Sequence, residues 1–477
     1  MKIVYIILTV VIMFSDVRAE DYSELINTKD LQADFTQLYT DLKKSHIDLF
    51  ANVSEQQYDT KFTDIMGQLD KPLTRLKAHT LFQEFVAFGL IAHSNIGFPA
   101  TAYESFRNDG GKAFPIYVTI NGDQWFVEDD YSVLNLSKGT PITHIDDVPV
   151  QQLLTELHKY ISADTPAIAS SLLEYQLPQY LWLVNAVAGK ASESAKLTII
   201  HDAKEQHLEV NFIDQVTLQE RIAGDIAESE STSSKLREYR ALSEKIGYLK
   251  PGPFYNAENP ADLWNNSEFS QFIDEAMESF ITNGKEAIII DVRNNPGGTN
   301  TFSDHLIAWF ANKPFKFASQ FLIRSSEHAQ ASNAVRLSSS TEDMNSVSHQ
   351  LAKFYEEHPF DTVANFNLAD SLPRDGEKFE GEIYVLIDRS SYSNAVSLAA
   401  IVQDYNLGKV VGEATADFAT TYASMESFTL TNTGIQVGFP KAHIIRPSGD
   451  KKAGPVYPDI ILNDVTIDSV VTAIANK

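Results

Sequence analysis

Three serines cluster in the stretch DRSSYSNAV, residues 388–396, between an apolar strand-like run and a segment with helical spacing. Ser393 stands at the junction, so we expect its hydroxyl beside the first free N–H groups of the helix. A serine at such a position commonly caps the helix. The same place also favours a nucleophile, because the positive end of a helix stabilises negative charge nearby. The residues alone leave both roles open.

A second candidate is the loop NNPGGTN, residues 294–300, which follows the apolar run IIIDV. Gly297 and Gly298 would turn backbone N–H groups into a concave loop, where a developing oxyanion could be held. Paired glycines also serve tight turns that need positive φ angles. The motif by itself does not decide between an oxyanion site and a simple turn.

Other kinds of chemistry find little support in the sequence. The 477 residues include no cysteine, which excludes disulfides, thiolate metal sites and a cysteine nucleophile. The histidines lack the spacing of a metal motif and no phosphate-binding loop is present, so we predict no metal and no other cofactor. A formal net charge of −26 argues against nucleic acid and anionic membrane surfaces as partners.

The elements that must position these residues fall into regions along the chain. Residues 20–112 carry apolar side chains at helical intervals and predict a helical region, whose second helix should end near His93. Residues 113–213 predict short strands with one amphipathic helix after Val148. Residues 214–246 are charged and rich in serine, as expected for a linker or an exposed helix.

Residues 247–477 predict an α/β core. A helix whose apolar face carries Phe269, Ile273 and Phe280 precedes the apolar strand EAIIIDV, and helical and strand-like runs alternate after it. This order implies parallel strands joined by right-handed crossovers. Near the end of the chain, Asn432–Gly434 separates two alternating runs and predicts a hairpin.

The two candidate loops together resemble motifs of the C-terminal-processing, or tail-specific, serine peptidases of family S41 and their tricorn-core relatives. In that family the first motif reads approximately D-L-R-x-N-x-G-G, and here it is DVRNNPGG. The second runs from a Ser-rich turn through QDY to VVGE-x-T, here VVGEAT at residues 410–415. The resemblance implies a crotonase/ClpP-like βαβ peptidase core in which Ser393 is the nucleophile. It also implies an oxyanion hole formed by the N–H of Asn394 and that of Gly297 or Gly298.

A further, partial resemblance concerns residues 139–157, GTPITHIDDVPVQQLLTEL. They are similar to the strand-turn-helix of PDZ domains in exported proteases, although Asp146 and Asp147 stand where Asn-Gly is usual. The resemblance implies a PDZ-like, β-rich insert at residues 113–213 that selects substrates by their C-termini. A small β-rich spacer without a ligand is the alternative.

The general base departs from part of the family pattern. The bacterial branch uses a lysine shortly after VVGE-x-T, but Phe418 stands at that position here. No nearby lysine replaces it, and Lys409 or Lys441 would have to reach the site from elsewhere. A Ser-Lys dyad is therefore not expected.

The tricorn-like branch instead uses a histidine from the helical region, which corresponds to His93, followed here by Ser94. Imidazole can accept the hydroxyl proton and return it to the leaving amine near neutral pH. A histidine held by the last carbonyls of a helix is the alternative. The late glutamate that supports the histidine in that branch has no direct counterpart; Asp450 could substitute, or no acid is needed.

The first 19 residues combine Lys2, an apolar run and Ala19 before Glu20, which predicts a secretory signal peptide cut after Ala19. A signal anchor is the alternative, although the apolar run is short for a membrane span. We therefore expect an exported protein, periplasmic or secreted, with no membrane insertion after cleavage.

These observations lead to a serine endopeptidase that cleaves extended or unfolded polypeptides through an acyl-enzyme. Two alternatives stay open. The missing lysine and the unassigned acid fit a catalytically inactive peptide-binding protein on the same scaffold. A crotonase-like acyl-transfer enzyme would share the core, but export and a PDZ-like insert argue against it. The oligomeric state is not predicted.

Overall fold

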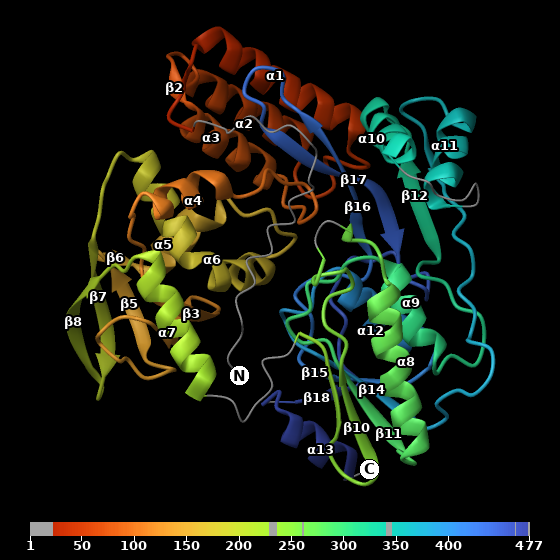
Figure 1. Ribbon diagram of the computed structural model, residues 1–477. Coiled ribbons are helices and arrows are strands. Elements are labelled where there is room, and N and C mark those ends of the chain that lie inside the picture. Colours follow the sequence, from red (N-terminus) through yellow and green to blue (C-terminus); the bar gives the residue numbers. More distant parts are fainter. Residues whose placement is uncertain (1–21, 229–235, 260–261, 340–345, 463, 476–477) are drawn as a thin grey trace. The chain divides into compact units, whose positions relative to one another are not determined.

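The chain divides into two compact units in the computed structural model (Figure 1). The model describes residues 22–228, 236–259, 262–339, 346–462 and 464–475. The first unit contains the described part of residues 1–234 with 325–361 and 424–441, and the second contains that of 235–324, 362–423 and 442–477. The predicted signal peptide, residues 1–19, lies outside the described residues.

A mixed α/β fold with a helical N-terminal region is confirmed. In the first unit, the ring of Phe35 contacts those of Phe62, Phe82 and Phe85 at centroid separations of 4.9, 5.2 and 4.9 Å. Because the rings come from three helices, they join these helices into one apolar core. The elements here are β1 (Leu25–Ile26), α1 (Thr28–Ser45), α2 (Glu55–Gln68), β2 (Leu73–Thr74), α3 (Arg75–Ala87) and α4 (Ala100–Asn108).

The prediction that the second helix ends near His93 is wrong, because α3 ends at Ala87. Gly89 lies so close to α2 that a Cβ there would meet the hydroxyl of Tyr58 at 2.0 Å. Leu90 then takes a positive φ of 53°, which a continuing α-helix does not allow. His93 therefore lies in the loop that follows the helix.

Residues 113–213 form an antiparallel sheet, as the alternating runs predict, in the order β3-β4-β5-β7-β8. The long helix α6 is absent from the prediction, because its polar residues lie on several faces and do not form one polar face that would mark a helical period. The elements are β3 (Ile116–Asn121), β4 (Gln124–Asp130), β5 (Pro141–Ile145), β6 (Val148–Pro149), α5 (Val150–His158), α6 (Pro166–Val187), β7 (Ser194–His201) and β8 (Lys204–Asn211).

The stretch 214–246, expected to be a linker or an exposed helix, contains regular elements at both ends. Helix α7 (Gln215–Glu228) follows the sheet, and strand β9 (Glu238–Ala241) pairs antiparallel with β10 (Ile246–Lys250). The second unit therefore includes an edge strand, β9, within residues that were predicted to form a linker or an exposed helix.

Later parts of the chain complete the first unit. They are α10 (Glu327–Ser339), α11 (Val347–Glu357) and the greater part of the hairpin of β16 (Thr421–Thr429) and β17 (Gln436–Ile445). The hairpin predicted around Asn432–Gly434 is confirmed. The buried carboxylate of Asp34 accepts the N–H groups of Asn432 at 3.0 Å and Thr433 at 2.6 Å, which fastens the turn to α1.

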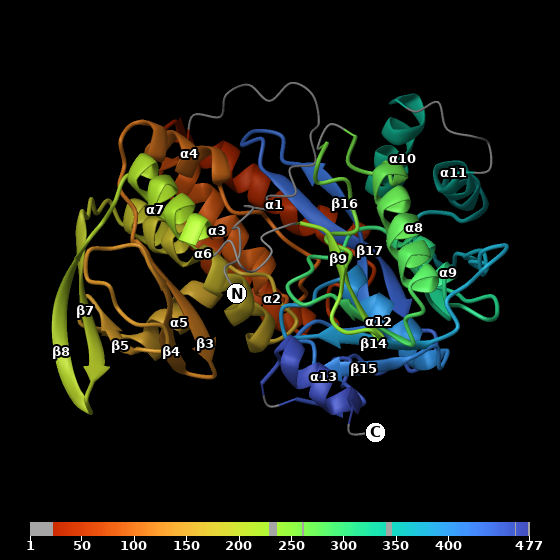
Figure 2. The same ribbon diagram turned by 60° about the horizontal axis from the view of Figure 1, so that its bottom comes forward.

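The second unit is built on a sheet in the order β18-β15-β14-β11-β10-β9, parallel except for β9. Its inner strands are apolar on both faces, as the run EAIIIDV predicts, because helices cover both sides. Figure 2 shows α8, α9 and α12 on one side of the sheet and α13 on the other. The elements are β11 (Ala287–Asp291), β14 (Glu382–Ile387), β15 (Lys409–Gly412), β18 (Ile460–Ile461), α8 (Ser267–Thr282), α9 (Asn300–Ala308), α12 (Asn394–Asp404) and α13 (Ile467–Ala475).

A smaller sheet also belongs to the second unit. Strand β12 (Gln320–Arg324) pairs antiparallel with β13 (Val363–Asn365) and with the last residues of β17. The predicted core 247–477 is therefore not one uninterrupted unit, because residues 325–361 and 424–441 cluster with the first unit. Among the described residues, no helix combines the length and apolar character needed to cross a membrane.

Candidate active site

Ser393 lies in a strained turn between β14 and α12. Its φ of 54° and ψ of −120° fall outside the regions that non-glycine residues ordinarily occupy. The residue precedes α12, yet its side chain makes no cap hydrogen bond to the helix. Such strain persists only when the surroundings enforce it, and it gathers at functional sites. Of the two roles that the sequence leaves open, Ser393 does not take that of a helix cap.

The neighbouring Ser391 has a different task. It is fully buried, and its Oγ donates to the carbonyl of Val292 at 2.8 Å and accepts the N–H of Asp388 at 3.1 Å. The first contact holds the serine turn against the end of β11, and the second closes the turn after β14. Ser393, by contrast, is half-buried, and its hydroxyl makes no hydrogen bond within the described part of the chain.

The glycine loop approaches this turn closely. At Gly297, where φ is 82°, a Cβ would lie 2.6 Å from the N of Asn394 and 2.8 Å from the Cβ of Ser393. At Gly298, where φ is 138°, a Cβ would lie 2.0 Å from the carbonyl oxygen of Phe254. Both positions therefore require glycine, for backbone angle and for space. The structure brings the two predicted loops together.

The backbone N–H groups of this pair of loops are not equivalent. That of Gly297 donates to the side chain of Asn295 at 2.9 Å, so it is already used. Those of Gly298 and Asn394 have no acceptor among the described residues. Of the two glycines predicted to serve an oxyanion, only Gly298 thus keeps its donor open.

Several hydrogen bonds fix the loops to each other. The N–H of Tyr392 donates to the carbonyl of Asn295 at 2.9 Å. The side-chain amide of Asn295 donates in turn to the carbonyl of Gly252 at 2.7 Å. Asn394 donates from its side chain to the carbonyl of Thr299 at 2.9 Å, which joins α12 to the start of α9. The contacts preorganise the turn without using the Ser393 hydroxyl.

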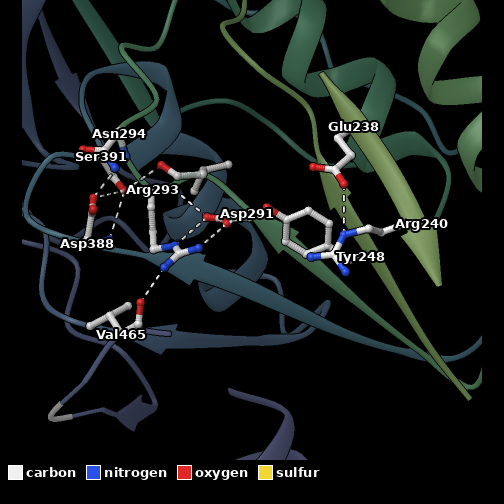
Figure 3. Close-up of polar contacts among 10 residues, drawn as sticks. Glu238, Arg240, Tyr248, Asp291, Arg293, Asn294, Asp388, Ser391 and Val465 are labelled. Carbon is white, nitrogen blue, oxygen red and sulfur yellow. Dashed lines mark hydrogen bonds and ion pairs between the residues drawn. The ribbon is translucent and has the colours of Figure 1, made fainter. Parts of the chain in front are cut away.

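A buried charged network lies beneath the loops (Figure 3). Asp291, at the end of β11, accepts two hydrogen bonds from the guanidinium of Arg293, at 2.9 and 2.6 Å, and one from the hydroxyl of Tyr248 at 2.9 Å. Arg293 also donates to the carbonyl of Val465. Burial, together with the charge of Asp291, raises the pKa of Tyr248, so the phenol stays a neutral donor.

Asp388 joins both loops from the end of β14. Its Oδ1 accepts the N–H of Asn294 at 3.2 Å and that of Ser390 at 3.0 Å. Burial raises the pKa of Asp388 to about 6, and these donors only partly oppose the shift. This carboxylate has no role in the prediction from sequence, although it begins the Ser-rich motif.

A second carboxylate, that of Asp417, is also absent from the prediction, and it contacts Ser393 directly. The N–H of Ser393 donates to Asp417 at 2.5 Å, and Asp417 is almost fully buried. Asp417 immediately precedes Phe418, which occupies the place of the lysine in the bacterial branch. Its position beside that expected base was the only signal in the sequence that could have drawn attention to it.

His93 and Ser94 belong to the first unit. Both are buried, and their loop is held by an antiparallel bridge between Asn95 and Gly438. It is also held by His79 of α3, whose Nε2 lies 2.8 Å from the carbonyl oxygen of Gly97. Burial lowers the pKa of His79 to about 4, so this anchor is neutral at physiological pH.

The other candidate residues are engaged elsewhere. Lys409 is exposed at the first residue of β15, whereas Ser393 follows the opposite, carboxyl end of the adjacent parallel strand β14. Lys441 is buried and forms an ion pair with Glu426 in the first unit. Asp450 is exposed, and its carboxylate accepts the N–H of Lys452 at 3.0 Å in its own loop. None of these contacts involves the Ser393 turn.

A parallel sheet that presents a serine with a free hydroxyl on a strained strand-to-helix turn is characteristic of serine hydrolases. Residues 245–462 match the model of peptidase family S41, so this part of the chain is that of a serine-type peptidase of the family. No curated protein sequence matches the chain significantly.

Solved structures resemble the chain over nearly its whole length. Mature CPAF complexed with lactacystin aligns with a TM-score of 0.66 and 15% identity over 94% of this chain and 97% of that one. Mature CPAF alone gives 0.63 and 14% over 94% and 96%. The photosystem II D1 C-terminal processing protease gives 0.45 and 12% over 93% and 96%. The likeness to CPAF shows a shared fold.

Proposed function

We propose that this serine peptidase uses Ser393 as its nucleophile and His93 as its general base. The Oγ of Ser393 attacks a peptide carbonyl carbon while its proton passes to the imidazole. The C–N bond then breaks, and the imidazolium returns the proton to the leaving amine. Water, activated by the same imidazole, hydrolyses the acyl-enzyme and restores the serine.

The proposal assigns the oxyanion hole to the N–H groups of Gly298 and Asn394. Both are open donors beside Ser393, and backbone amides at a helix start stabilise the negative charge of a tetrahedral intermediate. Gly297 has a different part: it lets the two loops approach, while its own N–H binds Asn295. The observation that carries the proposal is the strained backbone of Ser393, whose hydroxyl has no hydrogen bond to any residue that the structure describes.

The substrate class follows from the family and from the insert. A peptidase acts on polypeptides, and we propose extended or unfolded chains as substrates. The sheet of β3 to β8 with α5 and α6 supports the PDZ-like assignment of residues 113–213, and the parallel sheet of the second unit supports the crotonase/ClpP-like core. We further propose export to the periplasm or the medium, with cleavage after Ala19.

Labelling with a fluorophosphonate tests the nucleophile, because this reagent phosphonylates activated serines. Wild type should be labelled, and peptide mapping should place the label on Ser393. Ser393→Ala should abolish both the labelling and the hydrolysis of a fluorescent casein substrate. Ser390→Ala is the matched control, since it removes a hydroxyl from the same turn, and it should retain both activities.

His93→Gln tests the base in the same assay. Without an imidazole to accept the proton, both the labelling rate and casein hydrolysis should fall by about 100-fold or more. Unchanged labelling of this variant would remove His93 from the mechanism. A wild type that binds casein but is never labelled would instead support the peptide-binding alternative.

A further inference from the structure

We propose that Asp417 is a positioning residue that locks Ser393 in its reactive conformation and leaves the oxyanion hole to Gly298 and Asn394. The inference rests on the proposed role of Ser393 as nucleophile. It assigns a function to a carboxylate that the family motifs do not mark in this sequence.

Asp417 is itself held rigidly in the loop after β15. It is 1% exposed, and its carbonyl oxygen accepts the hydroxyl of Thr415 at 2.7 Å. The Oγ of Thr415 also accepts the N–H of Val456 at 2.9 Å, and Phe418 pairs with Pro455 in an antiparallel bridge. The carboxylate therefore extends from a segment that is fixed on both sides.

The two oxygens of this carboxylate serve two backbone donors. Its Oδ2 accepts the N–H of Ser393 at 2.5 Å, and its Oδ1 accepts the N–H of Phe418 at 2.8 Å. Hydrogen bonds to an ionised acceptor are shorter and stronger than those between neutral groups, especially away from water. This arrangement can compensate the unfavourable φ of 54° at Ser393.

The contact also determines which donors can bind an oxyanion. In some serine peptidases the N–H of the nucleophile itself contributes to the hole. Here that N–H is used by Asp417, so it is withdrawn from the hole. The open N–H groups of Asn394 and Gly298 are left to face the substrate carbonyl. Asp417 thus sets both the direction of the Ser393 hydroxyl and the composition of the oxyanion hole.

Two substitutions at Asp417 test the inference. Asp417→Ala removes both acceptors, and it should lower the second-order rate constant for fluorophosphonate labelling of Ser393 by roughly 10- to 100-fold. Asp417→Asn keeps the shape of the side chain but only one acceptor oxygen, so its labelling rate constant should fall by less than that of Asp417→Ala. With fluorescent casein, kcat should fall in the same order while KM changes by less than about threefold, because substrate binding is untouched.

Asp459→Asn is the control, since its carboxylate also accepts a backbone N–H, from Val410 at 2.8 Å, in the same unit. Its labelling rate should equal that of wild type. Thermal unfolding of each variant is measured in parallel; if the alanine variant does not fold, the isosteric asparagine variant decides.

The outcomes separate the inference from the function on which it rests. If Asp417→Asn and Asp417→Ala are labelled at Ser393 as fast as wild type, the positioning role alone is overturned. The same follows if the Asp417 variants raise KM at constant kcat, or if Asp459→Asn loses as much labelling rate as they do. Absence of labelling at Ser393 in wild type would overturn the proposed function and this inference together.

Discussion

Replacing Asp388 by asparagine is predicted to stabilise the protein at neutral pH, although the residue joins both loops of the site. Its Oδ1 accepts hydrogen bonds from Asn294 N at 3.2 Å and Ser390 N at 3.0 Å. An asparagine that presents its carbonyl oxygen at this place can keep both. The substitution therefore removes the partly buried charge and preserves these contacts.

The size of the effect follows from the pKa. Burial raises the pKa of Asp388 to about 6 from an ordinary value of 3.8. As the pH rises, the carboxyl ionises first in the unfolded chain, so stability that is present below about pH 4 is lost as the pH passes through about 6. A shift of about two pKa units corresponds to about 3 kcal/mol. Asp388→Asn avoids this loss.

Urea unfolding of wild type and Asp388→Asn from about pH 3.5 to about pH 8 checks the prediction. The two free energies of unfolding should be similar at the acid end. They should diverge as the pH rises, until the variant is more stable by about 1–3 kcal/mol above pH 7. Asp123→Asn, which removes one charge from an exposed position, is the control. Parallel curves for wild type and Asp388→Asn would refute the reasoning.

Two further substitutions test the site and the first unit. Gly297→Ala places a Cβ 2.6 Å from the backbone nitrogen of Asn394 in α12 and strains a φ of 82°. It should therefore reduce kcat by about 100-fold or more in the casein assay. A variant with the kcat of wild type would show that the loops need not approach so closely. Glu426→Gln leaves the cations of Arg336 and Lys441 without their buried partner and should cost about 3–5 kcal/mol in urea unfolding. The exposed pair of Glu156 offers the comparison: Glu156→Gln should change stability little, and equal losses would contradict the reasoning.

The sequence predicts the elements whose signal is local. The helix α8 follows from the spacing of Phe269, Ile273 and Phe280, and Gly284 appears just after its end with a φ of 62°. Strands β11, β14 and β15 follow from short apolar runs that are buried on both faces. The approach of Gly297 to the Ser393 turn was expected from the resemblance of the two loops to the S41 motifs, and the structure brings the loops together.

The sequence could not predict what depends on contacts between distant residues. Asp417 acts through a backbone N–H far away in the chain, and neither residue type nor spacing marks that contact. The requirement for glycine at position 89, just after α3, comes from Tyr58 of another helix. In helix α6 the polar residues, such as Glu174, Gln179 and Asn185, are spread around the helix, and so its apolar periodicity is weak.

The interleaving of the two units has a consequence for how the protein can be divided. Each unit is assembled from three separate pieces of chain, so the polypeptide passes five times from one to the other. A fragment that stops at residue 234 would keep α1 but lack the hairpin turn, and the carboxylate of Asp34 would lose the N–H donors of Asn432 and Thr433. Recombination between relatives would therefore have to exchange three segments at once to transfer either unit intact.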